Sequence, residues 1–155
     1  MINNDVLRRL RYALNITDIK VIELFKLADY EMAKPELESI FKKEDEAGYA
    51  ECGDLILERF LAGLIISRRG ERDEGKARQA QDRTRFSNND ILKSVRIALE
   101  LKDDDIIGMM ALAGVELSKP ELTSFFRKMG QRNYRPCGDQ FLRNFLVGLT
   151  AKYRV

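Results

Sequence analysis

The sequence contains no histidine and only two cysteines, Cys52 and Cys137. The lack of histidine excludes Ser–His and Cys–His nucleophilic pairs, the commonest general base and the usual histidine-containing zinc spheres. Two isolated cysteines cannot complete a structural zinc site. No phosphate-binding loop occurs either, because the Gly-Lys pair at 75–76 lacks the flanking residues of a P-loop. We therefore expect no enzyme activity, no catalytic or metal-ligating residues and no bound cofactor.

Long apolar runs and a strong charge of one sign are also missing. A membrane-spanning helix needs roughly 18 apolar residues or more, and no run approaches that length. The first residues are polar and lack the basic-then-apolar order of a signal peptide. The net charge of +2 is too small to indicate nucleic acid or an acidic membrane. We expect a cytoplasmic protein with free thiols and no membrane partner.

The sequence contains an internal tandem repeat. A shift of 85 positions aligns residues 3–70 with 88–155 without a gap. Roughly two in five aligned positions are identical, and the identities cluster in short motifs. The recurring motifs are Asn-Asn-Asp, Lys-Pro-Glu-Leu, Cys-Gly-Asp and Phe-Leu-x-Gly-Leu. Chance does not produce such clusters in one gapless register, so we interpret the chain as a tandem repeat.

The repeats are separated by a segment that cannot bury a core. Residues 71–85 carry five basic and four acidic side chains and no large apolar one. We assign 1–70 to a first helical repeat, 71–85 to a charged linker and 86–155 to a second helical repeat. The first repeat has 11 basic and 13 acidic residues, whereas the second has 11 and 8.

Each repeat is predicted to form four short helices. Apolar residues recur at helical spacing, as in Leu57, Phe60, Leu61 and Leu64, and no period-two alternation or hairpin turn occurs. The fold class is therefore all-α, with two tandem copies of a four-helix unit. The expected helix starts in the first repeat are Asn3 or Asn4, Thr17 or Asp18, Pro35 and Asp54, and the fourth helix should stop at Gly70.

The Asn-Asn-Asp opening, the run Arg-Arg-Leu-Arg-Tyr-Ala-Leu at 8–14, the Cys-Gly-Asp turn and Phe-Leu-x-Gly-Leu resemble the YehS-like proteins. These are small bacterial cytoplasmic proteins made of a duplicated domain of unknown function. The resemblance covers both repeats and brings no assigned catalytic residue. The second repeat departs from the pattern, with Ile97 in place of Tyr12 and Pro136 in place of Glu51. These departures argue against an exact functional equivalence of the two repeats.

Most recurring polar residues have a structural explanation at helix starts. Asparagine and aspartate there accept hydrogen bonds from free backbone N–H groups and oppose the helix dipole. We expect this capping role for the following residues: Asn4, Asp18, Asp54, Asn89, Asp103 and Asp139.

Arg11 and Arg96 recur where a helix stripe calls for apolar residues. The alternatives are a stem that covers core while the guanidinium reaches water, a structural ion pair, and a ligand-binding arginine. We predict ion pairs of Arg11 with Asp54 and of Arg96 with Asp139. Glu31 and Glu116 are the second choices.

Gly63 and Gly148 stand inside helices, where glycine costs about 1 kcal/mol relative to alanine. We expect both to be helix-contact glycines that face a neighbouring helix at close range, with a kink or a backbone-exposed ligand site as alternatives. For Cys52 and Cys137 three roles stay open: small buried side chains, a reactive thiolate ahead of a helix, or a disulfide between the repeats.

By exclusion, the sequence favours a non-catalytic protein-binding or adaptor-type function with an unidentified protein partner. The alternative is nucleic-acid binding through basic residues of the second repeat and the first helix, where Arg8, Arg9 and Arg11 cluster. Small-ligand binding is the remaining class. The candidate binding surface in the second repeat is an aromatic among basic residues: Arg127, Lys128, Arg132, Tyr134 and Arg135.

Overall fold

The computed structural model describes residues 1–70 and 85–154, and within these ranges it contains eight α-helices and no strand. The first repeat consists of α1 (Asn3–Leu14), α2 (Asp18–Leu27), α3 (Lys34–Phe41) and α4 (Asp54–Arg69). Each helix starts within a residue of its expected position, since local signals are strong there. The Thr17 hydroxyl, for example, accepts a hydrogen bond from the Lys20 N–H and caps α2.

The second repeat has the same four helices in the same order. They are α6 (Asn88–Leu99), α7 (Asp103–Leu112), α8 (Lys119–Phe125) and α9 (Asp139–Tyr153). At the start of α8, Ser118 and Glu121 bond each other's backbone N–H reciprocally, as their spacing predicts. The prediction of an all-α fold made of two four-helix units is confirmed. The expected linker at 71–85 lies almost entirely outside the described residues.

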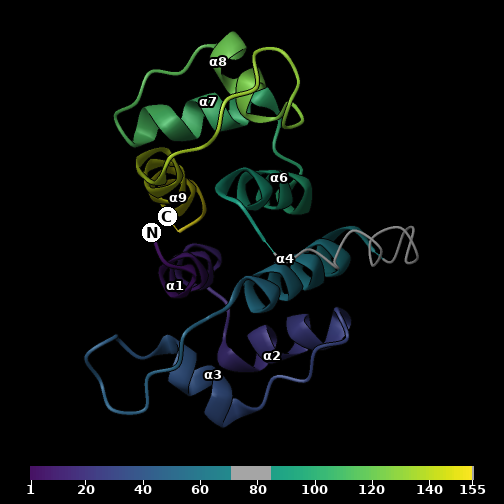
Figure 1. Ribbon diagram of the computed structural model, residues 1–155, viewed down its shortest axis with the longest axis vertical. Helices are drawn as coiled ribbons and strands as arrows, with labels where there is room; N and C mark the ends of the chain where they lie inside the picture. Colours follow the sequence, from purple (N-terminus) through teal and green to yellow (C-terminus); the bar gives the residue numbers. More distant parts are fainter. Residues whose placement is uncertain (71–84, 155) are drawn as a thin grey trace.

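The two repeats exchange packing partners. Helix α1 packs mainly against α9 of the other repeat, and α4 packs as extensively against α6 of the other repeat as against its own α2, whereas α1 and α4 touch each other only slightly. Helices α2 and α7 cover the outer sides of α4 and α9. Figure 1 shows the result, with α1, α4, α6 and α9 in the middle, α2 and α3 at one end and α7 and α8 at the other. The buried side chains of both repeats consequently form one continuous core.

Arginines at the C-terminal ends of the two longest helices make equivalent contacts across the interface between the repeats. Arg154 of α9 donates to the Tyr12 carbonyl (2.9 Å) and to the Asn15 side chain (3.1 Å) at the end of α1. Its counterpart Arg69 donates to the Ile97 carbonyl (3.4 Å) and lies 3.6 Å from Glu100 at the end of α6. Each guanidinium therefore binds the negative end of a helix dipole in the opposite repeat.

The two recurring glycines permit the closest helix contacts within each repeat. A Cβ atom on Gly63 of α4 would overlap the backbone carbonyl of Leu24 in α2, and one on Gly148 of α9 would overlap that of Met109 in α7. This is the close helix approach that the sequence predicts for both positions. A side chain cannot be accommodated without separating the helices, because the obstructing atoms belong to the backbone.

We expect Gly63→Ala and Gly148→Ala each to lower the free energy of unfolding by about 1–3 kcal/mol, because the added methyl group must push two helices apart. The measurement is a urea unfolding curve followed by circular dichroism.

Gly108 provides the matched control. It lies in α7, is exposed and has no atom within 4 Å of an added Cβ. Gly108→Ala should therefore raise the free energy of unfolding by about 0.5–1 kcal/mol through helix propensity. Equal effects at Gly63 and Gly108 would contradict the proposed close contact.

Candidate functional site

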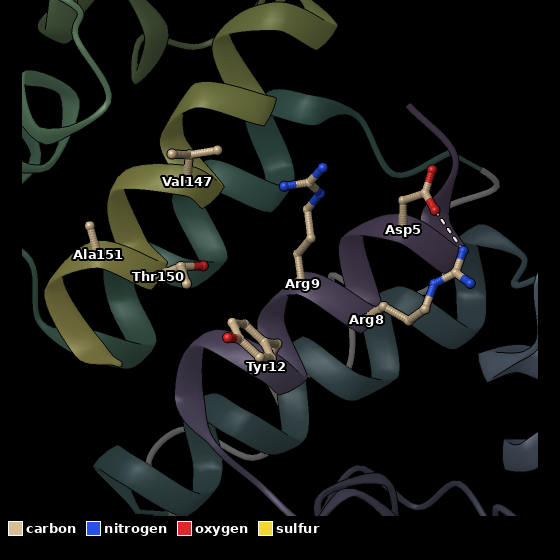
Figure 2. Close-up of a pocket in the computed structure, with 7 residues that line it drawn as sticks. All are labelled: Asp5, Arg8, Arg9, Tyr12, Val147, Thr150 and Ala151. Carbon is tan, nitrogen blue, oxygen red and sulfur yellow. Dashed lines mark hydrogen bonds and ion pairs between the residues drawn. The ribbon is translucent and has the colours of Figure 1, made fainter. Parts of the chain in front are cut away.

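A pocket of about 650 Å³ lies between the first and last helices. Figure 2 shows its lining, which comes from α1 on one side and α9 on the other. We call this site the α1–α9 groove. It exists only because the repeats pack on each other. Its lining residues are Asp5, Arg8, Arg9, Tyr12, Val147, Thr150 and Ala151.

Two arginines of α1 line the groove, and they differ in their hydrogen-bond and ion-pair partners. Arg8 Nη2 lies 2.6 Å from Asp5 Oδ1, and Arg8 also donates to the Lys42 carbonyl at 3.3 Å. Arg9 is exposed and extends from α1 toward α9, away from this ion pair (Figure 2). Among the described residues it forms no hydrogen bond or ion pair. The groove therefore contains one neutralised guanidinium and one that is free to bind an anion.

The rest of the groove is mostly apolar. Tyr12 is 57% exposed and Val147 is 41% exposed, and the two side chains face the same groove. The Arg154 guanidinium carbon lies 3.9 Å from the centre of the Tyr12 ring, so the ring is held in place by a cation–π contact. The Thr150 hydroxyl donates to the Leu146 carbonyl. Because the hydroxyl is used within α9, the methyl group of Thr150 adds to the apolar surface of the groove.

The equivalent face between α4 and α6 has different chemistry. The residues 85 positions away from Arg9 and Tyr12 are Ser94 and Ile97. The same backbone arrangement is therefore built without the free guanidinium and without the aromatic ring. The repeated fold can therefore form with other residues at the positions of Arg9 and Tyr12.

The predicted arginine pairs are wrong in their acidic partners. Arg11 Nη2 lies 2.8 Å from Asp18 Oδ1, and its guanidinium stacks on the Phe41 ring at 4.9 Å. In the second repeat Arg96 donates to Asp103 at 2.7 Å and stacks on Phe126 at 4.6 Å. Both pairs are local in sequence, because the arginine lies in the last turn of one helix and the aspartate is the first residue of the next helix.

Asp54 and Asp139 are not available to these arginines. Asp54 accepts hydrogen bonds from the Asn3 side chain (2.8 Å) and from the Phe86 N–H of the other repeat (3.1 Å). Asp139 accepts the equivalent bonds from Asn88 and from the Met1 nitrogen. The prediction assumed that the first helix docks on the fourth helix of its own repeat, but these helices exchange partners. The two carboxylates join the repeats instead.

The capping role expected of Asn4 and Asn89 is also wrong. Asn4 is fully buried inside α1, where it donates to the Ile40 and Ala50 carbonyls and accepts from the Cys52 N–H, all at 2.9 Å. Asn89 makes the same three bonds to Phe125, Arg135 and Cys137. Each asparagine thus provides hydrogen-bond partners for backbone groups at the end of the third helix and in the loop before the fourth helix. It does not bond the N–H groups of its own helix start, as a cap would.

The basic surface predicted in the second repeat lies in the α8–α9 loop, and none of its residues lines the α1–α9 groove. Arg127, Lys128 and Arg132 are exposed, and Tyr134 is half-buried. Arg135 is engaged by the fold, because it lies 3.8 Å from Glu121 and stacks on Phe125 at 5.2 Å. The basic cluster of α1 is divided in a similar way, since Arg8 and Arg9 line the groove while Arg11 pairs with Asp18.

Comparison with known proteins places the chain in a family. The family described as a protein of unknown function (DUF1456) matches residues 3–70 and again residues 88–154. The chain belongs to this family. The uncharacterized protein YehS of Escherichia coli (strain K12) is 38% identical over 155 residues, which cover 100% of this chain and 98% of the relative. No solved structure shows a significant match.

The described residues show neither a membrane-crossing helix nor a metal-ligand cluster. No helix in 1–70 or 85–154 is long and apolar enough to cross a membrane. In the same ranges, no three Asp, Glu or Cys side chains come together as a metal site would require.

The two cysteines are free and buried, with 2% of Cys52 and 7% of Cys137 exposed. Burial in the core raises the pKa of each thiol from 9.0 to about 12, and the neighbouring carboxylate, Asp54 or Asp139, adds to this effect. A nucleophilic thiolate requires the opposite shift. These contacts assign the cysteines to the core and disfavour both a reactive thiolate and a disulfide.

We expect both thiols to react slowly with iodoacetamide at pH 8 in the native protein, because a thiol with a pKa about 12 is ionised in roughly one molecule in ten thousand. Since each folded-state pKa is raised, the free energy of unfolding should also fall as the pH rises from 9.0 toward about 12. Mass spectrometry of alkylated protein with and without urea, and urea curves across that pH range, provide the two measurements.

The control for alkylation is the unfolded protein in urea, in which both cysteines should react at the rate of a free thiol. Rapid and selective labelling of Cys52 or Cys137 under native conditions would contradict the burial and reopen a nucleophilic role.

Proposed function

We propose that this protein is a non-catalytic protein-binding protein of the adaptor type, and that the α1–α9 groove is its binding site. The observation that carries the proposal is the joint exposure of Tyr12 and Val147 beside the free guanidinium of Arg9. Tyrosine and arginine are the residues over-represented among those that dominate protein–protein binding energy. An aliphatic wall next to them allows a side chain of the bound protein to be desolvated.

The open shape of the groove supports a macromolecular ligand. Its walls are two helix faces, and four of its seven lining residues come from α1 while three come from α9. Helical grooves of this kind accept an extended or helical segment of another protein, with a few side chains anchored between the walls. Asp5 is the one carboxylate in the lining, and it forms an ion pair with Arg8 rather than a pair with a second acid or base. We therefore favour binding over acid–base catalysis as the role of the groove.

Nucleic-acid binding is the second candidate, because a separate observation favours it. Arg127, Lys128 and Arg132 are exposed in the α8–α9 loop, and no acidic partner contacts them within the described part of the chain. Phosphate contacts of this kind produce binding that weakens steeply with salt. Against it, the groove itself contains Asp5 and four residues with apolar surface, which a phosphate backbone does not match.

The test is an affinity capture from bacterial lysate with three forms of the full-length protein as bait. The groove variant Arg9→Ser/Tyr12→Ile carries the residues of the second repeat at these positions, so it should fold normally. Arg132→Ala removes one charge from the α8–α9 loop, where the first repeat has Ala47. We expect proteins retained by the wild type and by Arg132→Ala to be recovered roughly tenfold less by the groove variant.

Nuclease treatment separates the two candidates. Capture through the groove should survive nuclease and should weaken with salt less steeply than capture through several phosphate contacts. Capture that disappears after nuclease, or that is lost with Arg132→Ala and kept by the groove variant, would favour nucleic acid and contradict the proposal.

A further inference from the structure

We infer that the ligand of the α1–α9 groove is an acidic segment of another protein, in which a carboxylate is followed closely by an aliphatic side chain. This inference rests on the function proposed above and specifies the chemistry of the partner. The carboxylate would bind Arg9, and the aliphatic side chain would lie against Tyr12 and Val147.

The charges around the groove require a negative ligand. Asp5 is the only acidic residue that lines it, and its carboxylate is already bound by Arg8. Arg9 has no partner among the described residues, whereas Arg154, beside Tyr12, is bound to the C-terminal end of α1. One positive charge of the groove lining, that of Arg9, therefore has no counter-charge within the described part of the chain. A planar guanidinium pairs well with a carboxylate, because two parallel N–H···O bonds can form.

The apolar side of the groove restricts the ligand further. Tyr12 and Val147 expose surface on opposite walls, and Ala151 and the Thr150 methyl group continue that surface along α9. A purely polyanionic ligand would leave this surface in water. A carboxylate-bearing residue next to leucine, isoleucine or valine would cover it, and the excluded water would strengthen the ion pair with Arg9.

The corresponding face of the second repeat serves as an internal reference. It has Lys93 and Asp90 where the groove has Arg8 and Asp5, so the charge signs recur, but Asp90 there accepts hydrogen bonds from the Ser87 N–H and hydroxyl. It has Ser94 and Ile97 where the groove has Arg9 and Tyr12. The α9 wall differs as well, because α4 has Ala62, Ile65 and Ile66 at the positions of Val147, Thr150 and Ala151. On the α1 wall the two differences are the free cation and the aromatic ring, which an acidic, partly apolar segment would contact.

The experiment is a selection of random twelve-residue peptides displayed on phage, performed on the full-length protein, followed by fluorescence anisotropy of the enriched peptides. We expect the enriched peptides to combine Asp or Glu with a neighbouring aliphatic residue. Arg9→Ser should weaken their binding roughly tenfold or more, and replacing the peptide carboxylate by its amide should weaken it similarly. The amide peptide should lose little more on Arg9→Ser, because both changes remove the same ion pair.

Arg132→Ala controls for loss of one positive charge elsewhere and should leave peptide affinity unchanged within about twofold. A labelled single-stranded oligonucleotide controls for non-specific anion binding. The urea curve of Arg9→Ser should match the wild type, and that of Tyr12→Ile should show a loss of no more than about 1 kcal/mol from the missing cation–π contact with Arg154. Curves of this kind exclude misfolding as the cause of weaker binding.

The outcomes separate the two levels of the proposal. Neutral or basic peptides whose binding depends on Tyr12 but not on Arg9 would overturn the acidic ligand and leave the protein-binding groove intact. Tight, Arg9-dependent binding of the oligonucleotide would overturn both. The inference also fails if no peptide binds the wild type more tightly than it binds Arg9→Ser/Tyr12→Ile.

Discussion

In each half of the molecule the first helix packs on the fourth helix of the other half, and the remaining structure depends on this exchange. Helix α1 lies against α9 and α4 against α6, with Arg154 and Arg69 bound to the ends of the opposite helices. A repeat that contributed its first and fourth helices to each other would bury a core of its own. Because it does not, the apolar faces of α1 and α6 are covered only when both repeats are present.

The same exchange creates the candidate site. Arg9 and Tyr12 near one end of the chain are brought beside Val147 and Ala151 near the other end. Neither repeat alone contains the groove. Two equivalent faces result from the duplication, and only one of them has an arginine at the position of Arg9 and an aromatic ring at the position of Tyr12. The binding function proposed for the α1–α9 groove rests on this difference between two structurally equivalent faces.

Local features of the fold could be predicted from sequence, and non-local ones could not. Ser118 caps α8 where its spacing to Glu121 indicates, since a cap involves residues three positions apart. The start of α2 was predicted, but its cap is Thr17 and not Asp18. Gly63 and Gly148 could be predicted as helix contacts because the cost of an internal glycine points to a packing requirement. The partners of Arg11, Asn4 and Asp54 were mispredicted, because they depend on which helices meet. The groove was missed for the same reason, although the change from Tyr12 to Ile97 at an exposed position was a signal of it.

Native-state hydrogen exchange of Gly148→Ala compared with the wild type tests the shared core most directly. The substitution disturbs the contact between α9 and α7 in the second repeat. If the repeats fold as one cooperative unit, the slowest-exchanging amides of α1 and α4 will lose the same free energy of protection as those of α6 and α9. Unchanged protection in α1 and α4, with a loss confined to the second repeat, would show that the repeats are independent and would contradict the exchange of packing partners as the basis of the fold.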